Sequence, residues 1–164
     1  MNIDIKLVDS NDIKKVINFM TDESFNLFLD LYIPEEKREF YLKHYQTVKQ
    51  KYNDSYHNHL ESGGKFYAAY NDDEIVGAGF ITKENYLDSL FVSKKYQNKG
   101  IGSKILKSIV KDEINNGSIT INARNKYLDL YKKIGFRINE DTRSEIYTKM
   151  IYDKNDNEIN NLNK

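Results

Sequence analysis

The chain has 164 residues, a usual size for one domain, and carries 25 Lys and Arg against 25 Asp and Glu. This balance creates no global field for nucleic acid or an anionic membrane, so neither is expected as a partner. The absence of cysteine excludes disulfides, a thiol nucleophile and thiolate metal sites. Because there is no signal-peptide pattern and no run of about 18 apolar residues, we expect a cytoplasmic protein, and its richness in Asn, Ile, Lys and Tyr suggests an AT-rich bacterial genome.

The first part of the chain predicts a strand followed by helices. Apolar and polar residues alternate over residues 2–8, which is the pattern of a strand. Ser10 is a candidate N-cap for an amphipathic helix that runs to Met20. Residues 21–24 are expected to separate this helix from a second apolar group over residues 25–31.

A second helical segment is predicted from Pro34, the only proline of the chain. Followed by two glutamates, this proline fits the first position of a helix, where its missing N–H costs nothing. The aromatic spacing predicts a long helix that fades over residues 54–59. The glycines at residues 63–64 end it.

Two strands joined by a polar turn follow, over residues 65–70 and 74–82, and they predict a hairpin. Gly77 and Gly79 lie inside the second of these strands. Glycine within a strand indicates a bulge or a close approach of another element.

Residues 86–106 predict a strand, a glycine loop and a helix, around which the other motifs are arranged. Residues 86–92 are apolar and rich in aromatic and branched side chains, and the helical period begins at Ile101 and fades near Asn115. Between them, residues 97–102 contain two glycines one residue apart. Free N–H groups and the helix dipole point at this loop, which predicts a site for phosphate or pyrophosphate.

The last part of the chain predicts a strand over residues 118–122 and a helix over residues 126–134. Two more strands are expected over residues 136–138 and 145–152. Residues 153–164 are polar without a period and are expected to be disordered.

Two common phosphate motifs do not fit the glycine loop. A dinucleotide fingerprint would need a third glycine where Ile105 stands, and a Walker loop would need Gly-Lys-Ser/Thr after four spacer residues. The loop does fit the pattern Gln/Arg-x-x-Gly-x-Gly/Ala. With the strand before it and the helix after it, this stretch resembles the GNAT superfamily of acyl-CoA-dependent N-acetyltransferases.

A second motif supports this resemblance. Residues 122–136 hold a Leu-Tyr pair at 130–131 and end in Gly-Phe at 135–136, as in the other hallmark of that family. One departure is Tyr127, which stands where the family often has a small residue four positions before its tyrosine. A bulky ring there either narrows the acyl-CoA channel or points elsewhere.

The resemblance implies an α/β (α+β) GNAT fold. Its central sheet is mixed, mostly antiparallel, has about seven strands and is flanked by about four helices, and the order of the predicted elements agrees with it. The domain is expected to span residues 1–152, with the tail at 153–164.

The resemblance also implies the site. Tyr131 is the candidate acid for the leaving thiolate, by analogy with the family. Asp88 is the candidate base, acting through a water, and an edge-strand charge that faces solvent is an equal alternative; Glu84 is a weaker substitute. The candidate contacts of acetyl-CoA are the backbone of Leu90, Phe91 and Val92, the pyrophosphate loop Gln97, Asn98, Lys99, Gly100, Ile101, Gly102 and Ser103, and the side chains of Asn122 and Asn125.

The implied function is transfer of an acetyl group from acetyl-CoA to a primary amine of a small molecule or peptide, by direct attack in a ternary complex. The alternative is a non-catalytic acyl-CoA-binding regulatory module. Residues 20–62 are expected to form the acceptor wall, and a homodimer remains open. No metal is expected, because His57-x-His59 lacks a third ligand at suitable spacing.

Overall fold

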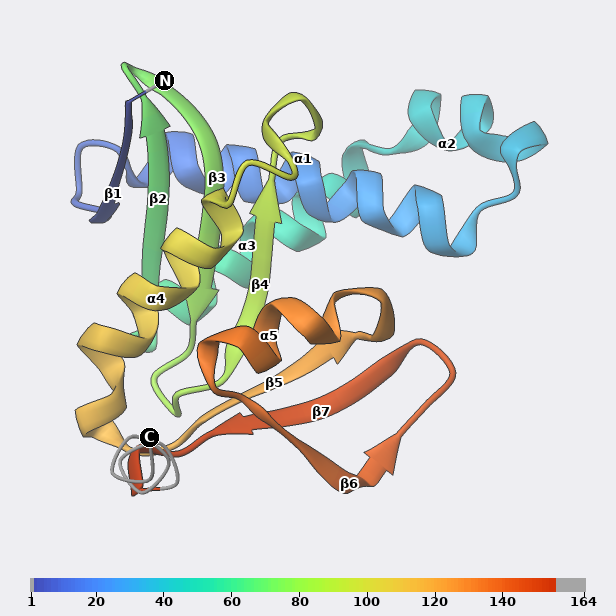
Figure 1. Cartoon of the computed structure of the whole chain (residues 1–164). Coiled ribbons are helices and arrows are strands. Elements are labelled where there is room, and N and C mark those ends of the chain that lie inside the picture. Colours follow the sequence, from blue (N-terminus) through green and yellow to red (C-terminus); the bar gives the residue numbers. More distant parts are fainter. Residues whose placement is uncertain (1, 156–164) are drawn as a thin grey trace.

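The structure is a computed structural model that describes residues 2–155, except for the side chains of residues 140–143. Helices and strands alternate as the sequence predicts, although several bounds differ (Figure 1). The elements in chain order are β1 (Ile3–Leu7), α1 (Ile13–Tyr32), η1 (Glu35–Lys37), α2 (Arg38–His44), α3 (Gln46–Glu61), β2 (Lys65–Asn71), β3 (Glu74–Ile81), β4 (Leu87–Val92), η2 (Lys94–Tyr96), α4 (Ile101–Glu113), η3 (Ile114–Asn116), β5 (Ile119–Arg124), η4 (Asn125–Tyr127), α5 (Leu128–Ile134), β6 (Arg137–Arg143) and β7 (Tyr147–Tyr152).

The seven strands of the described residues form two antiparallel sheets. One has the order β1-β2-β3-β4 and the other β5-β7-β6. A parallel bridge between Tyr86 and Thr120 connects the sheets where β4 and β5 begin. The expected mixed, mostly antiparallel arrangement is therefore present, but the strands separate into two sheets beyond that bridge.

The four-stranded sheet is covered on both faces, which explains the near-continuous apolar runs of β2 and β3. Tyr67 and Ala69 of β2 face α4 and join the larger core cluster. Phe66 and Ala68, on the opposite face, join a second cluster with α1 and α3. The result is three layers, with α4 on one side of the sheet and α1 and α3 on the other (Figure 1).

Both predictions for the glycines in β3, a bulge and a close approach of another element, are confirmed. The pairing of β2 with β3 shifts register beside Gly77, so the strand bulges there. A Cβ on Gly77 would lie 3.0 Å from the Ile105 side chain, and one on Gly79 would lie 2.9 Å from Ile109. These glycines let α4 pack closely against the sheet.

The predicted break in the first helix is wrong, because α1 runs without interruption through residues 21–24. Thr21 and Ser24 are buried and face the core, so the polar segment lies on the inner side of one long helix. The predicted N-cap at Ser10 is also wrong. The N-cap is Asp12, which makes no side-chain cap hydrogen bond, and in the turn before the helix Asp9 Oδ1 accepts the N–H groups of Asn11 and Asp12 at 2.9 and 3.3 Å.

The single long helix predicted after Pro34 is divided into η1, α2 and α3. The chain turns at Tyr45, whose ring stacks on Phe25 of α1 with centroids 4.4 Å apart. The expected fading over residues 54–59 does not occur, because Tyr56 is buried against Phe66 and Phe80 and holds α3 to the sheet. Apart from β6, which extends to Arg143, the other bounds agree within a few residues.

No helix within residues 2–155 is long and apolar enough to cross a membrane. Residues 156–164, most of the predicted tail, lie outside the described part of the chain.

A buried carboxylate ties the C-terminal end of α4 to the sheet. Glu113 is 4% exposed, and both of its oxygens lie 2.9 Å from Lys65 Nζ. Tyr67 donates its hydroxyl to the same carboxylate at 2.6 Å, and Asn116 donates its amide at 3.0 Å. A buried charge needs such partners to offset its desolvation.

We expect Glu113→Gln to lower the free energy of unfolding by about 1–3 kcal/mol, because a charged acceptor of several hydrogen bonds is lost. Lys65 stays half-exposed and keeps water around its ammonium, which limits the loss. Urea unfolding at neutral pH measures the difference. Glu61→Gln, at the exposed end of α3, is the matched control and should change stability by less than about 0.5 kcal/mol.

The same carboxylate predicts a pH dependence. Burial raises the pKa of Glu113, but the hydrogen bonds from Tyr67, Lys65 and Asn116 outweigh it and leave that pKa below its ordinary value. A carboxyl with a lowered folded-state pKa stabilises fully above its unfolded pKa of about 4.3, and the contribution is lost as pH falls through the folded value. The stability difference between wild type and E113Q should therefore shrink below about pH 4, and a constant difference would contradict this role.

Candidate active site

The site is organised by an irregularity in β4. Ile81 of β3 pairs with Leu87, whereas the neighbouring Phe80 pairs with Ser89, so Asp88 is an extra residue in β4. Such a bulge bends a strand and redirects a side chain. Beyond the bridge at Tyr86, β4 is hydrogen-bonded along one edge to β3, and no ladder pairs its other edge among the described residues. The backbone of residues 90–92 lies on this part of the strand, beyond the bulge.

The glycine loop lies beyond the end of β4. Gly100 has a φ of +76° and caps α4 in a left-handed conformation that favours glycine. Asn98 also has a positive φ, of +59°. Gln97 donates its side-chain amide to the carbonyl of Val92 at 2.9 Å and so ties the loop to β4. The N–H groups at the start of α4 form the kind of terminus that binds an anion.

The two motifs that are far apart in sequence meet at Gly102. A Cβ added to this residue would lie 3.7 Å from Val92 of β4 and 3.8 Å from Leu130 of α5. The loop, the strand and the second motif therefore converge. This face of β4, toward α4 and α5, is named the donor side below.

Tyr131 lies on α5 and is 6% exposed. Its ring meets Phe136 edge to face at 5.7 Å and belongs to the core cluster against which Leu90 and Val92 of β4 pack. Burial raises the pKa of Tyr131 well above its ordinary value. The side chain is therefore a phenol at neutral pH and can donate a proton or a hydrogen bond.

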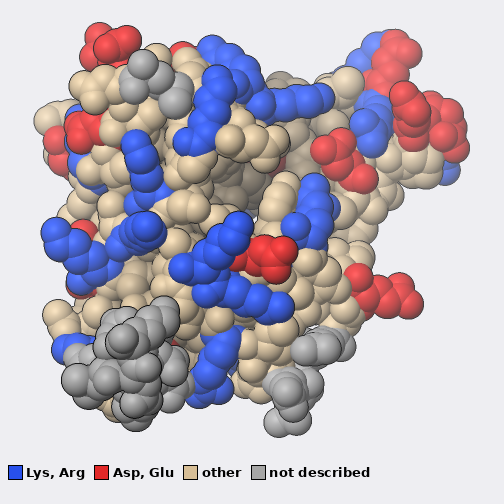
Figure 2. Space-filling model, viewed as in Figure 1, with Lys and Arg blue, Asp and Glu red and all other residues tan. Residues whose placement is uncertain are grey.

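Charge is unevenly distributed along the chain. Residues 94–134, from η2 through α5, contain ten Lys and Arg against three Asp and Glu, although the whole chain is neutral. Figure 2 shows Lys and Arg side chains gathered on the face that carries α4 and α5. This local excess of positive charge favours a polyanionic ligand on the donor side.

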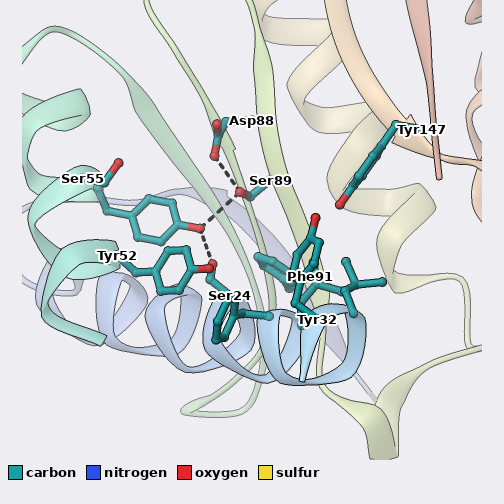
Figure 3. Close-up of a pocket in the computed structure, with 12 residues that line it drawn as sticks. Ser24, Tyr32, Tyr52, Ser55, Asp88, Ser89, Phe91 and Tyr147 are labelled. Carbon is teal, nitrogen blue, oxygen red and sulfur yellow. Dashed lines mark hydrogen bonds between the residues drawn. The ribbon is translucent and has the colours of Figure 1, made fainter. Parts of the chain in front are cut away.

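A pocket of about 320 Å³ lies on the opposite side of β4, toward α1 and α3 (Figure 3). We call it the acceptor pocket. Aromatic and aliphatic side chains dominate its lining, with three serines and one carboxylate. It is lined by Ser24, Leu27, Phe28, Leu31 and Tyr32 of α1, Tyr52, Ser55 and Tyr56 of α3, Asp88, Ser89 and Phe91 of β4, and Tyr147 of β7.

A chain of hydrogen bonds forms one wall of the acceptor pocket (Figure 3). Ser89 donates to Asp88 Oδ2 at 2.7 Å, and Tyr56 donates to Ser89 at 3.2 Å. Ser24 lies 2.7 Å from the Tyr56 hydroxyl. Since the single phenol proton goes to Ser89, Ser24 acts as donor to Tyr56, and every bond in the chain is directed toward Asp88. Burial raises the pKa of Tyr56 to about 12, so it stays protonated.

The expected acceptor wall at residues 20–62 contributes to this pocket, but not through its carboxylates. Asp22 pairs with Lys49, and Asp30 pairs with Arg38 at 3.3 Å, so both lie in ion pairs away from the lining. Phe28 and Tyr32 of α1, with Tyr52 and Tyr56 of α3, supply the aromatic rings that this segment gives to the lining. Periodicity could not separate a helix face that meets the pocket from one that meets a neighbouring helix.

A second, wider cavity of about 740 Å³ adjoins the first, since Asp88 and Tyr147 line both. Asn122, a candidate CoA ligand, lies here with Lys149. Asn125 lies elsewhere and holds the turn before β7. It donates to the carbonyls of residues 144 and 145 at 3.0 Å and accepts the Thr148 hydroxyl at 2.6 Å. The roles of both asparagines in binding stay predictions.

The three histidines do not come together. The ring of His44 lies 2.9 Å from the Phe40 carbonyl, and that of His59 packs near Phe80. Within the described part of the chain, no three His, Asp or Glu side chains are arranged to hold a metal ion.

Comparison with known proteins identifies the family of this site. A family model described as an acetyltransferase (GNAT) domain matches residues 28–151. The chain belongs to the GNAT acetyltransferase family. It is also 32% identical over 68 residues to YafP of Escherichia coli K12, described as an uncharacterized N-acetyltransferase. That match spans 41% of this chain and 43% of YafP, less than half of either protein.

Solved structures show the same fold. The PaiA N-acetyltransferase from Thermoplasma acidophilum, in complex with coenzyme A, has a TM-score of 0.68 at 20% identity. The match covers 93% of this chain and 99% of the PaiA chain. A Corynebacterium glutamicum protein described as histone acetyltransferase HPA2 and related acetyltransferase has a TM-score of 0.69 at 16% identity, covering 93% and 97%. The predicted GNAT fold is confirmed, with five α-helices in residues 2–155 rather than about four.

Sequence reasoning did not identify Ser24, Tyr56, Ser89 or Tyr147 as site residues. Ser24 and Tyr56 have no motif, Ser89 lies in the motif strand but no side-chain role was predicted for it, and Tyr147 reaches the pocket from β7 of the other sheet. A possible signal was Tyr56 itself, whose spacing from Tyr52 places both on one face of α3.

We expect Tyr56→Phe to lower the free energy of unfolding by about 1–2 kcal/mol, because Ser24 and Ser89 lose a buried partner. Thermal or urea unfolding measures the change. Tyr127→Phe is the control, since Tyr127 is exposed, and should cost less than about 0.5 kcal/mol. Equal stability of Y56F and wild type would show that the hydrogen-bond chain is not a stabilising element.

Proposed function

We propose that the protein transfers an acetyl group from acetyl-CoA to a primary amine of a small molecule or peptide, by direct attack in a ternary complex. One observation carries the proposal: the donor side and the acceptor pocket lie on opposite faces of β4, and Asp88 stands at the bulge between them. A thioester bound on one face and an amine bound on the other would meet at the unpaired edge of β4, beyond the bridge to β5.

The donor side fits the chemistry of acetyl-CoA. The N–H groups of Ile101, Gly102 and Ser103 can bind the pyrophosphate at the start of α4. Backbone groups of residues 90–92 can pair with the amides of the pantetheine arm, because the outer edge of β4 has no ladder partner among the described residues. Lys99 and Lys104 are exposed near the loop and can add positive charge for the phosphates.

The transfer needs an amine without its proton and a leaving group that is stabilised. The amine nitrogen attacks the thioester carbonyl, a C–N bond forms and the C–S bond breaks. Asp88, directly or through a water, takes the amine proton. Backbone N–H groups beyond the bulge can stabilise the charged carbonyl oxygen, and Tyr131 donates to the departing thiolate.

We expect Tyr131→Phe to lower kcat by about 100-fold or more, the usual contribution of general acid catalysis. The KM for acetyl-CoA should change little, because the ring and its packing remain. Thiol release during steady-state turnover measures both constants. Tyr41→Phe, on α2 and outside the described lining of both cavities, is the matched control, and unchanged turnover in Y131F would remove Tyr131 from the mechanism.

Asp88→Asn tests the base. We expect kcat/KM to fall about 100-fold near pH 7 and to recover as the pH approaches the pKa of an alkyl amine, about 10. At that pH solvent removes the proton that Asp88 would otherwise take. Asp73→Asn, in the exposed β2–β3 turn, is the control. A deficit of constant size from about pH 7 to pH 10 would show that Asp88 does not act as the base.

Binding and turnover together separate this proposal from a non-catalytic acyl-CoA-binding module. Both functions predict that acetyl-CoA raises the thermal midpoint by mass action. The transferase alone also predicts release of CoA when an amine is added. No shift at about millimolar acetyl-CoA would contradict both.

A further inference from the structure

Asp88 is the single charged residue among the described residues that line the acceptor pocket. From this lining we propose that the acceptor is a primary amine on an apolar or aromatic stem that carries no carboxylate or phosphate. This substrate class rests on the proposed function and narrows it, because it excludes free amino acids as good substrates.

The hydrogen bonds inside the pocket favour a cation over an anion. The donors of Ser89 and Tyr56 are already directed toward Asp88, so this wall presents a carboxylate rather than free N–H or O–H groups. An ammonium group needs acceptors, and a carboxylate group needs donors. A substrate carboxylate beside Asp88 would also meet a like charge, and although Asp88 is exposed and water screens part of the repulsion, the repulsion still disfavours an anion there.

The remaining walls favour an apolar stem. Phe28, Leu31 and Phe91 supply apolar surface, and Tyr32 and Tyr147 lie near one another at the pocket (Figure 3). Burial and the nearby Tyr32 raise the pKa of Tyr147, so it remains a neutral phenol. Aromatic rings bind both apolar stems and cations well. The volume, about 320 Å³, is at the small end of ligand pockets, which run from about 300 to 1,000 Å³.

Two cations lie near the pocket but not in its lining. The Arg124 guanidinium lies over the Tyr127 ring, 5.8 Å from its centroid. Lys149 lines the wider neighbouring cavity. When the amine of an acceptor lies at Asp88 and its stem enters the acceptor pocket, the stem points away from the wider cavity. A carboxylate that did pair with Lys149 would reverse the preference described below.

The test compares amines that differ in one charge. Phenethylamine lacks the α-carboxylate of phenylalanine, and phenylalaninamide keeps its size while removing the charge. Histamine with histidine, and 3-methylbutylamine with leucine, extend the comparison to other stems. The α-amine of phenylalaninamide is less basic than that of phenylalanine, so kcat/KM is compared per unprotonated amine. On this basis we expect phenylalaninamide to exceed phenylalanine by at least about 10-fold, because phenylalanine places a like charge near Asp88. In Asp88→Asn this ratio should fall below about 3-fold, whatever the absolute rate.

Calorimetric titration of the same amines into the CoA-bound protein gives the ratio without turnover. This readout keeps the test valid if D88N is inactive. Equal use or equal binding of phenylalanine and its amide, or a preference for phenylalanine, would overturn the substrate class and leave the transferase intact. Acetyl-CoA binding without binding or turnover of any carboxylate-free amine would also overturn it. Failure of the proposed function itself has another signature, the absence of a thermal shift with acetyl-CoA.

Discussion

The bridge between Tyr86 and Thr120 is the constraint on which the candidate site depends. Within the described residues it is the one point where backbone pairing joins the two sheets. Asn85 reinforces it, because its carbonyl accepts the N–H of Thr120 at 3.0 Å and its amide donates to the carbonyls of Glu113 and Gly117 at 3.3 Å. With β4 and β5 fixed at their beginnings, the natural twist of each sheet separates them further along.

This separation turns a core strand into a wall between two binding regions. Side chains of β4 pack into both hydrophobic cores, and its backbone keeps an edge available for a ligand. The bulge at Asp88 places a carboxylate at the boundary. Charge follows the same division, since the segment around the donor side is rich in Lys and Arg, whereas the described lining of the acceptor pocket contains one Asp and no Lys or Arg. A polyanionic donor and a cationic acceptor would each bind where the local charge is opposite to their own.

The donor side could be predicted from the sequence because its determinants are local. Gly100 and Gly102 are fixed by the geometry of one loop and one helix start, and Leu130 with Tyr131 by a short helix that packs nearby. The acceptor pocket could not be predicted, because it is assembled from α1, α3, β4 and β7. Ser24 and Tyr56 meet across 32 residues of sequence, and Tyr147 comes from the other sheet. Which face of an amphipathic helix meets a cavity depends on such contacts, and periodicity does not record them.

A crystal structure with acetyl-CoA bound tests the division of the site at β4 most directly. We expect the pyrophosphate at the N–H groups of residues 101–103, the pantetheine arm along the backbone of residues 90–92, and the sulfur within hydrogen-bond reach of the Tyr131 hydroxyl. The acetyl group should point through the opening between β4 and β5 toward Asp88. Acetyl-CoA bound instead between α1 and α3, in the acceptor pocket, would contradict the account.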